Sequence, residues 1–67
     1  MDIKKTLGKN LRKFVAEQKI SLEKLAYENQ ISKGYIYDMA NGEANVSLEM
    51  LEKVAKALKK KPKDLIS

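Results

Sequence analysis

The stretch that decides the fold is SLEKLAYENQISKGYIYDMANG, residues 21–42, whose pattern predicts two short helices joined by a tight turn. Ser21 and Ser32 are good N-caps, because a serine hydroxyl accepts an unpaired backbone N–H of the first helical turn. Asn41 and Gly42 are typical of a helix end, since glycine readily takes the left-handed conformation found there. We therefore expect one helix to begin just after residue 21 and a second just after residue 32.

Apolar residues in this stretch have the spacing of two helices that cross steeply. Such helices approach closely only where a small residue lies at the crossing, and Ala26 fits that position. Ile31, Ile36 and Met39 follow it by five, ten and thirteen residues, the spacings at which the turn and the second helix bury side chains against the first. On these residues the segment resembles the helix-turn-helix of the lambda-repressor and Cro-like DNA-binding proteins.

The resemblance extends over nearly the whole chain, from about Leu7 to Leu65. Residues 45–58 resemble the fourth helix of that family, and residues 61–66 resemble its short fifth helix. The resemblance therefore implies an all-α, five-helix, lambda-repressor-like bundle that forms a single helix-turn-helix domain over residues 1–67.

Helical periodicity outside the motif supports the same architecture. A first helix of about four turns and a fourth helix each have an apolar face, and Leu65 is expected to close the core after Pro62 has started the last helix. The apolar positions are Ile3, Leu7, Leu11, Phe14 and Val15 in the first helix, and Leu48, Leu51, Val54, Ala55 and Leu58 in the fourth.

The chain departs from the family pattern in the turn, in the first motif helix and at a pair of core positions. Where the turn usually has Gly this chain has Gln30, so either Gln30 or Asn29 must take a left-handed conformation at a cost of about 1 kcal/mol. Leu22 replaces a Gln that contacts phosphate in the family. Val15 and Ala40 replace a buried Arg–Glu pair, and because both charges are absent together we interpret the change as a variation of the core.

Composition excludes several classes of function. Sixty-seven residues make one small domain with room for one site, and the chain contains neither Cys nor His, the commonest metal ligands and general base. We expect no enzyme activity, no metal and no cofactor. No apolar run approaches the length of about 20 residues that spans a membrane, and the N-terminus lacks a signal-peptide core, so we expect a cytoplasmic protein.

By resemblance, the recognition helix that enters the major groove is about Ser32–Asn41. In the family, residues at four matching positions face base edges, and residues at the positions of Ser21, Tyr35 and Asn41 lie near phosphates. A lysine donates to guanine O6 and N7, an aspartate accepts from cytosine N4, and a tyrosine ring covers a thymine methyl. The expected base-edge residues are Lys33, Gly34, Tyr37 and Asp38, and the expected backbone contacts are Ser21, Ser32, Tyr35 and Asn41.

Charge by itself does not decide whether the chain binds DNA. The net charge of +5 suits phosphate neutralisation, but small domains often carry surplus lysines for solubility. Asp38 and Glu43 would be repelled by phosphates. We expect the lysines of residues 59–63 to stabilise a helix C-terminus at the far end of the fold, and Tyr27 to be half-buried packing.

The sequence therefore indicates a sequence-specific, repressor-like regulator of transcription that binds double-stranded DNA. Because one small domain makes few base contacts, we expect a homodimer on an inverted-repeat operator. The resemblance implies pairing through the fourth and fifth helices, with Ile66 and Met50 as apolar candidates. The alternative is a protein-interaction or antitoxin-like module that keeps the fold and reads little DNA, which a weak salt dependence of duplex binding would reveal.

Overall fold

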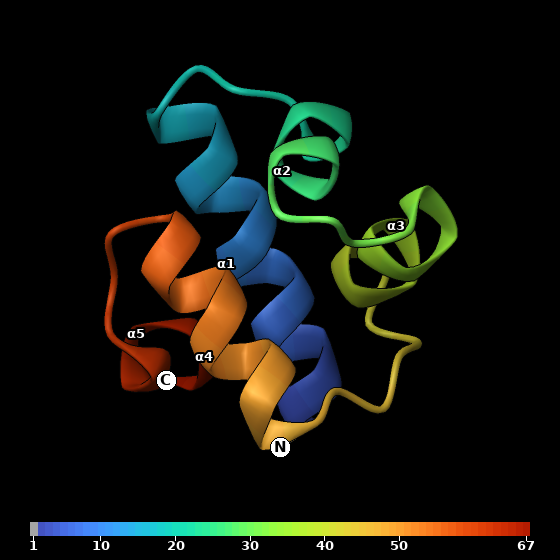
Figure 1. Ribbon diagram of the computed structural model, residues 1–67. Helices are drawn as coiled ribbons and strands as arrows, with labels where there is room; N and C mark the ends of the chain where they lie inside the picture. Colours follow the sequence, from blue (N-terminus) through green and yellow to red (C-terminus); the bar gives the residue numbers. More distant parts are fainter. Residues whose placement is uncertain (1) are drawn as a thin grey trace.

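Five α-helices and their connecting loops form the structure, a computed structural model that describes residues 2–67 (Figure 1). Among these residues there is no β-strand, and no helix is long and apolar enough to cross a membrane. The all-α, five-helix architecture expected from the sequence is confirmed. The helices are α1 (Ile3–Glu17), α2 (Leu22–Glu28), α3 (Lys33–Ala40), α4 (Leu48–Ala57) and α5 (Pro62–Ile66).

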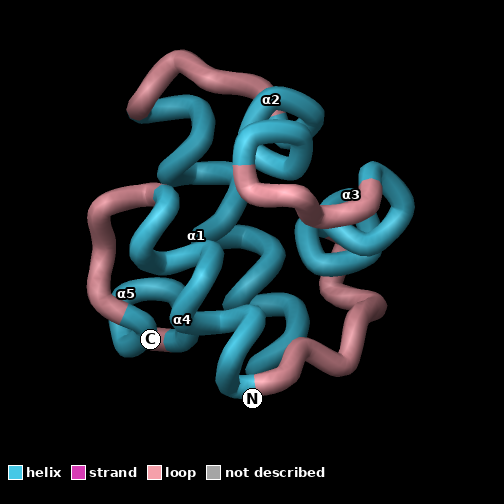
Figure 2. Tube along the Cα trace, viewed as in Figure 1, coloured by secondary structure: helices cyan, strands magenta, loops and turns pink. Residues whose placement is uncertain are grey.

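The longest helix, α1, organises the bundle. Helices α3 and α5 both pack on α1, α2 packs on α3, and α4 packs on α5. Figure 2 shows α3 and α5 on opposite sides of α1. The expected recognition helix and the lysine-rich end of the chain are therefore separated by the body of the domain.

All five helices contribute to one hydrophobic core. The largest fully buried side chains are Leu11, Leu25, Ile36, Met39, Val54, Leu58 and Leu65. The expectation that Ile3 and Leu48 belong to the core is wrong, because Ile3 is 54% exposed and Leu48 is 80% exposed. Each is the first residue of its helix. Because side chains tilt toward the helix N-terminus, a side chain in this position reaches past the neighbours that would cover it.

The expected caps of the motif are present. The Ser21 Oγ accepts a hydrogen bond from the backbone N–H of Lys24 at 3.0 Å, and the Ser32 Oγ accepts one from the N–H of Tyr35 at 3.1 Å. Gly42 follows α3 with φ of 75°. Each of the two serine cap bonds spans three residues, so the local sequence alone determines them.

The turn between α2 and α3 is tight and buried on its inner side. Ala26 is only 2% exposed, and its carbonyl accepts the N–H of Ile31 at 2.8 Å. Of the two candidates for the left-handed conformation, Gln30 takes it, with φ of 58°. Asn29 instead ends α2, and its side-chain amide donates to the Leu25 carbonyl at 2.9 Å.

Helices α1 and α3 approach each other closely at Gly8, which the sequence analysis did not single out. A Cβ atom added to Gly8 would lie 2.6 Å from the Ala40 carbonyl oxygen and 2.8 Å from that of Met39. The backbone of α1 thus touches the last turn of α3. Val15 and Ala40, where the family has an ion pair, are both buried, as expected for apolar replacements.

Arg12 bridges the same two helices one turn further along α1. Its Nε donates to the Ala40 carbonyl at 3.2 Å, and its Nη2 donates to the Asn41 side-chain oxygen at 2.6 Å. A cation at the end of a helix binds carbonyls that lack helical partners. Arg12 therefore fixes the C-terminal end of α3, although the matching family arginine is absent.

We predict that Gly8→Ala destabilises the domain by about 1–3 kcal/mol, because the added methyl group overpacks the contact between α1 and α3. Gly34→Ala is the matched control: a Cβ there meets nothing within 4 Å. Alanine is also the better helix former, so this variant should be neutral or more stable by up to about 1 kcal/mol. Urea unfolding of both variants measures the difference, and equal stabilities would contradict the close approach.

Candidate nucleic-acid interface

Helix α3 is anchored in the core by its inner face, so its outer face is turned to solvent. Ile36, Met39 and Ala40 are buried in the core. The remaining positions define the side of the helix that a ligand can reach. Ser32, Lys33, Gly34 and Asp38 are exposed there, whereas Tyr35 and Tyr37 are half-buried.

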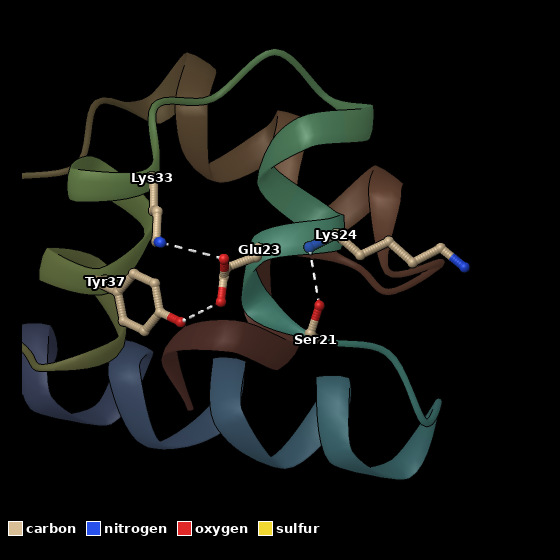
Figure 3. A network of polar contacts seen from close by, with 5 residues as sticks. All are labelled: Ser21, Glu23, Lys24, Lys33 and Tyr37. Carbon is tan, nitrogen blue, oxygen red and sulfur yellow. Dashed lines mark hydrogen bonds and ion pairs between the residues drawn. The ribbon is translucent and has the colours of Figure 1, made fainter.

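A carboxylate of α2 ties together two residues of this face (Figure 3). The Lys33 Nζ lies 3.2 Å from the Glu23 Oε2, and the Tyr37 hydroxyl donates to the Glu23 Oε1 at 3.2 Å. The hydrogen bond and the charge of Lys33, with a further bond from Tyr37, lower the pKa of Glu23. The Lys33 and Glu23 side chains are 70% and 57% exposed, so the pair adds little stability and mainly sets orientation.

The other tyrosine is also held in place. The Tyr35 hydroxyl donates to the Asn45 carbonyl at 3.4 Å, which joins α3 to the loop before α4. Both tyrosine rings of α3 are thus partly packed with their hydroxyls bonded within the protein. Each leaves part of its ring on the outer face.

Three expected backbone-contact residues keep a donor for phosphate. The Ser21 and Ser32 oxygens accept the cap bonds, which leaves each O–H to donate. The Asn41 side-chain oxygen is bonded to Arg12, which leaves its NH2 group as the donor. The roles of all eight expected site residues in DNA contact stay predictions.

Tyr27 does not lie as expected. It is 86% exposed, so the expectation of half-buried packing is wrong. Helix α2 has only seven residues, and no other helix covers its outer side, where Tyr27 borders a hollow shared with Glu23, Ala26, Ile31 and Lys33.

The charge is distributed unevenly along the chain. Residues 1–52 contain equal numbers of acidic and basic residues, so residues 53–67, with six lysines and one aspartate, carry the whole net charge of +5. In residues 21–43 there are two lysines and four acidic residues. The motif is thus net negative, and the excess of lysines lies at the end of the bundle that α1 separates from α3.

The lysine-rich end is tied down by backbone and aromatic contacts. Lys59 follows the Leu58 cap of α4 with φ of 59°, and the backbone N–H of Lys60 donates to the Ala55 carbonyl at 2.8 Å. The Lys60 ammonium lies 4.6 Å from the centre of the Phe14 ring, within the range of a cation–π contact. These contacts tie the connection between α4 and α5 to α1.

Comparison with known proteins identifies the family. The model of the Cro/C1-type helix-turn-helix DNA-binding domain matches residues 10–67. The chain belongs to this family. Control protein C.BamHI of Bacillus amyloliquefaciens is 39% identical over 66 residues, which cover 97% of this chain and 82% of that protein.

Two crystal structures share the fold. The clp gene regulator ClgR of Corynebacterium glutamicum has a TM-score of 0.87 and 33% identity, covering 94% of this chain and 67% of that one. The restriction-modification controller protein C.AhdI of Aeromonas hydrophila has a TM-score of 0.86 and 31% identity, covering 92% and 94%. The resemblance to lambda-repressor and Cro-like proteins is confirmed.

Sequence analysis missed the partnership of Glu23 with Lys33. It assigned Lys33 to a base edge and gave Glu23 no role in the site. The available signal was that oppositely charged residues occupy the first turns of two helices that cross in this family. In this chain, the lysine that is expected to contact a base is therefore paired with a carboxylate of α2.

We predict that the Glu23 network makes stability depend on pH. The pKa of Glu23 in the folded state is lowered from 4.5. The small contribution of the ionised Glu23 carboxylate to the free energy of unfolding is therefore complete above pH 4.5 and is lost as the pH falls through the lowered pKa. Thermal unfolding of wild type and Glu23→Gln between pH 6 and pH 3 measures this. The two stability curves should converge in acid, and a constant difference across the range would contradict the network.

Proposed function

We propose that this protein is a sequence-specific regulator of transcription that binds double-stranded DNA with α3 in the major groove. The observation that carries the proposal is the division of α3 into two faces. Ile36 and Met39 are buried, while Lys33, Gly34 and Asp38 are exposed on a helix of the width that a major groove admits. Membership of a DNA-binding family supports it.

Each exposed position has a defined task in this proposal. Lys33 donates to a guanine, Asp38 accepts from a cytosine amino group, and the Tyr37 ring covers a thymine methyl. Gly34 has no side chain and lets the helix approach the bases closely. The hydroxyls of Ser21 and Ser32 and the amide of Asn41 donate to phosphates, and Tyr35, whose hydroxyl is bonded to Asn45, contacts the DNA backbone through its ring. These contacts fix the register of the helix on the duplex.

The protein acts as a homodimer on an inverted-repeat operator in the cytoplasm. Half-site centres are then about 34–36 Å apart, one turn of DNA. The dimer forms through α4 and α5. An apolar hollow at the start of α4 supports this pairing, because Leu48 is 80% exposed and Ile66 is half-buried at its edge. Met50, also on α4, is half-buried.

Occupation of the operator blocks or recruits polymerase. The names of two relatives, a control protein and a restriction-modification controller, support regulation by a small protein of this kind. The competing candidate is a module that binds another protein. It is favoured by the net negative charge of residues 21–43, which weakens attraction to phosphates.

Selection of bound sequences from a random duplex pool tests the proposal. We expect an enriched motif with two-fold symmetry, and an affinity that falls steeply as salt rises because phosphate contacts release counterions. An unenriched pool, together with binding that salt barely affects, would favour the protein-interaction module.

We predict that Lys33→Ala weakens binding to the selected duplex by about 1–3 kcal/mol and relaxes preference at one base pair per half-site. Lys60→Ala should leave base preference intact, because Lys60 lies against Phe14 at the other end of the bundle and a phosphate contact carries no sequence information. Binding to selected and scrambled duplexes at two salt concentrations measures both effects. Equal losses on both duplexes for Lys33→Ala would show that α3 does not read bases.

A further inference from the structure

Lys33 and Glu23 form the only ion pair among residues 2–67. The chain has fourteen basic and nine acidic residues, so opportunities for other pairs are many. The pair joins the first turn of α2 to the first residue of α3. In Figure 3 the Lys24 ammonium points away from Glu23, which leaves Lys33 as the cation that the Glu23 carboxylate contacts.

The two oxygens of Glu23 have different partners. Oε2 contacts the Lys33 ammonium, and Oε1 accepts from the Tyr37 hydroxyl. Lys33 and Tyr37 are four residues apart, so they lie on the same face of α3. One carboxylate from α2 therefore sets the direction of two side chains that our proposed function assigns to base reading.

The bond to Glu23 leaves Lys33 with N–H donors that are free to contact DNA. A lysine ammonium has three N–H donors, so a bond to Glu23 leaves two for the edge of a guanine. The Lys33 side chain stays 70% exposed, so these donors can be reached by DNA. A lysine without such a partner is a flexible point charge that contacts any nearby phosphate.

Resting on the proposed function, we propose that Glu23 is a specificity-determining residue that positions Lys33 for base contact and keeps its charge from non-specific phosphates. The neutral pair contributes little to counterion release on a random duplex. On the cognate duplex the oriented ammonium binds the base without first losing its rotamer freedom. Glu23 thus lowers non-specific affinity while preserving specific affinity.

Glu23→Gln tests the inference with little change of shape. On scrambled duplex the variant should bind more tightly, and its salt slope should steepen by about 0.9 per subunit, the value of one added phosphate contact. The ratio of selected to scrambled affinity should fall by about 2- to 12-fold per subunit, since ordering one long side chain on binding costs about 0.5–1.5 kcal/mol.

Glu28→Gln is the matched control. Glu28 is an exposed acid on the same helix, and its substitution changes the net charge equally. It has no ion pair in the structure, so its salt slope and discrimination should stay at wild-type values. If Glu28→Gln and Glu23→Gln behave alike, the effect is one of total charge, and the inference is wrong.

The double variant Lys33→Ala with Glu23→Gln separates positioning from simple repulsion of DNA by Glu23. In the Lys33→Ala background, Glu23→Gln should no longer steepen the salt slope on scrambled duplex. A slope change that persists without Lys33 would overturn the inference, because Glu23 would then act on phosphates directly.

Wild-type binding distinguishes this failure from failure of the proposed function. If wild type binds neither duplex, the proposed function fails and the inference falls with it. If wild type discriminates between the duplexes and Glu23→Gln discriminates equally well, only the inference is wrong. Thermal unfolding at pH 7 confirms that each variant is folded when its binding is measured.

Discussion

The contact between α1 and the last turn of α3 is the constraint on which the rest of the structure depends. At Gly8 the two helices approach so closely that a single added carbon would lie 2.6 Å from the Ala40 carbonyl. Arg12 then bonds the end of α3 through Ala40 and Asn41. The other end of α3 is held by the turn after α2, where the Ala26 carbonyl accepts the N–H of Ile31, and by the Ser32 cap. The helix is thus fixed at both ends, and its outer face has a defined direction.

For DNA binding by this protein, the direction of the outer face of α3 matters more than the total charge of the chain. The excess of positive charge lies in residues 53–67, beyond α1, whereas residues 21–43 are net negative. A motif with little attraction for phosphates depends on the placement of its few donors. The Glu23–Lys33 pair is the clearest case, since the cation expected to read a base is oriented by a carboxylate of the preceding helix.

Local features of the fold could be predicted from the sequence, and distances between helices could not. The serine caps and the turn arise from bonds that span three to five residues, which a motif determines. The contacts of Gly8 and Arg12 join residues about thirty positions apart and depend on how closely two helices pack. Periodicity also assigned Leu48 to the core, because the pattern does not show where a helix extends beyond the helices that pack against it. In the candidate site, Lys33 was predicted from the sequence, but its pairing with Glu23 depends on how α2 and α3 cross.

The structure of this protein bound to its selected duplex, determined by crystallography, tests the central claim most directly. The account predicts α3 in the major groove, with the Lys33 ammonium at hydrogen-bond distance from a guanine edge and still within 4 Å of the Glu23 carboxylate. A complex in which α3 lies outside the groove would contradict the assignment of the recognition helix. A complex in which Lys33 has left Glu23 to contact a phosphate would contradict the positioning role of Glu23.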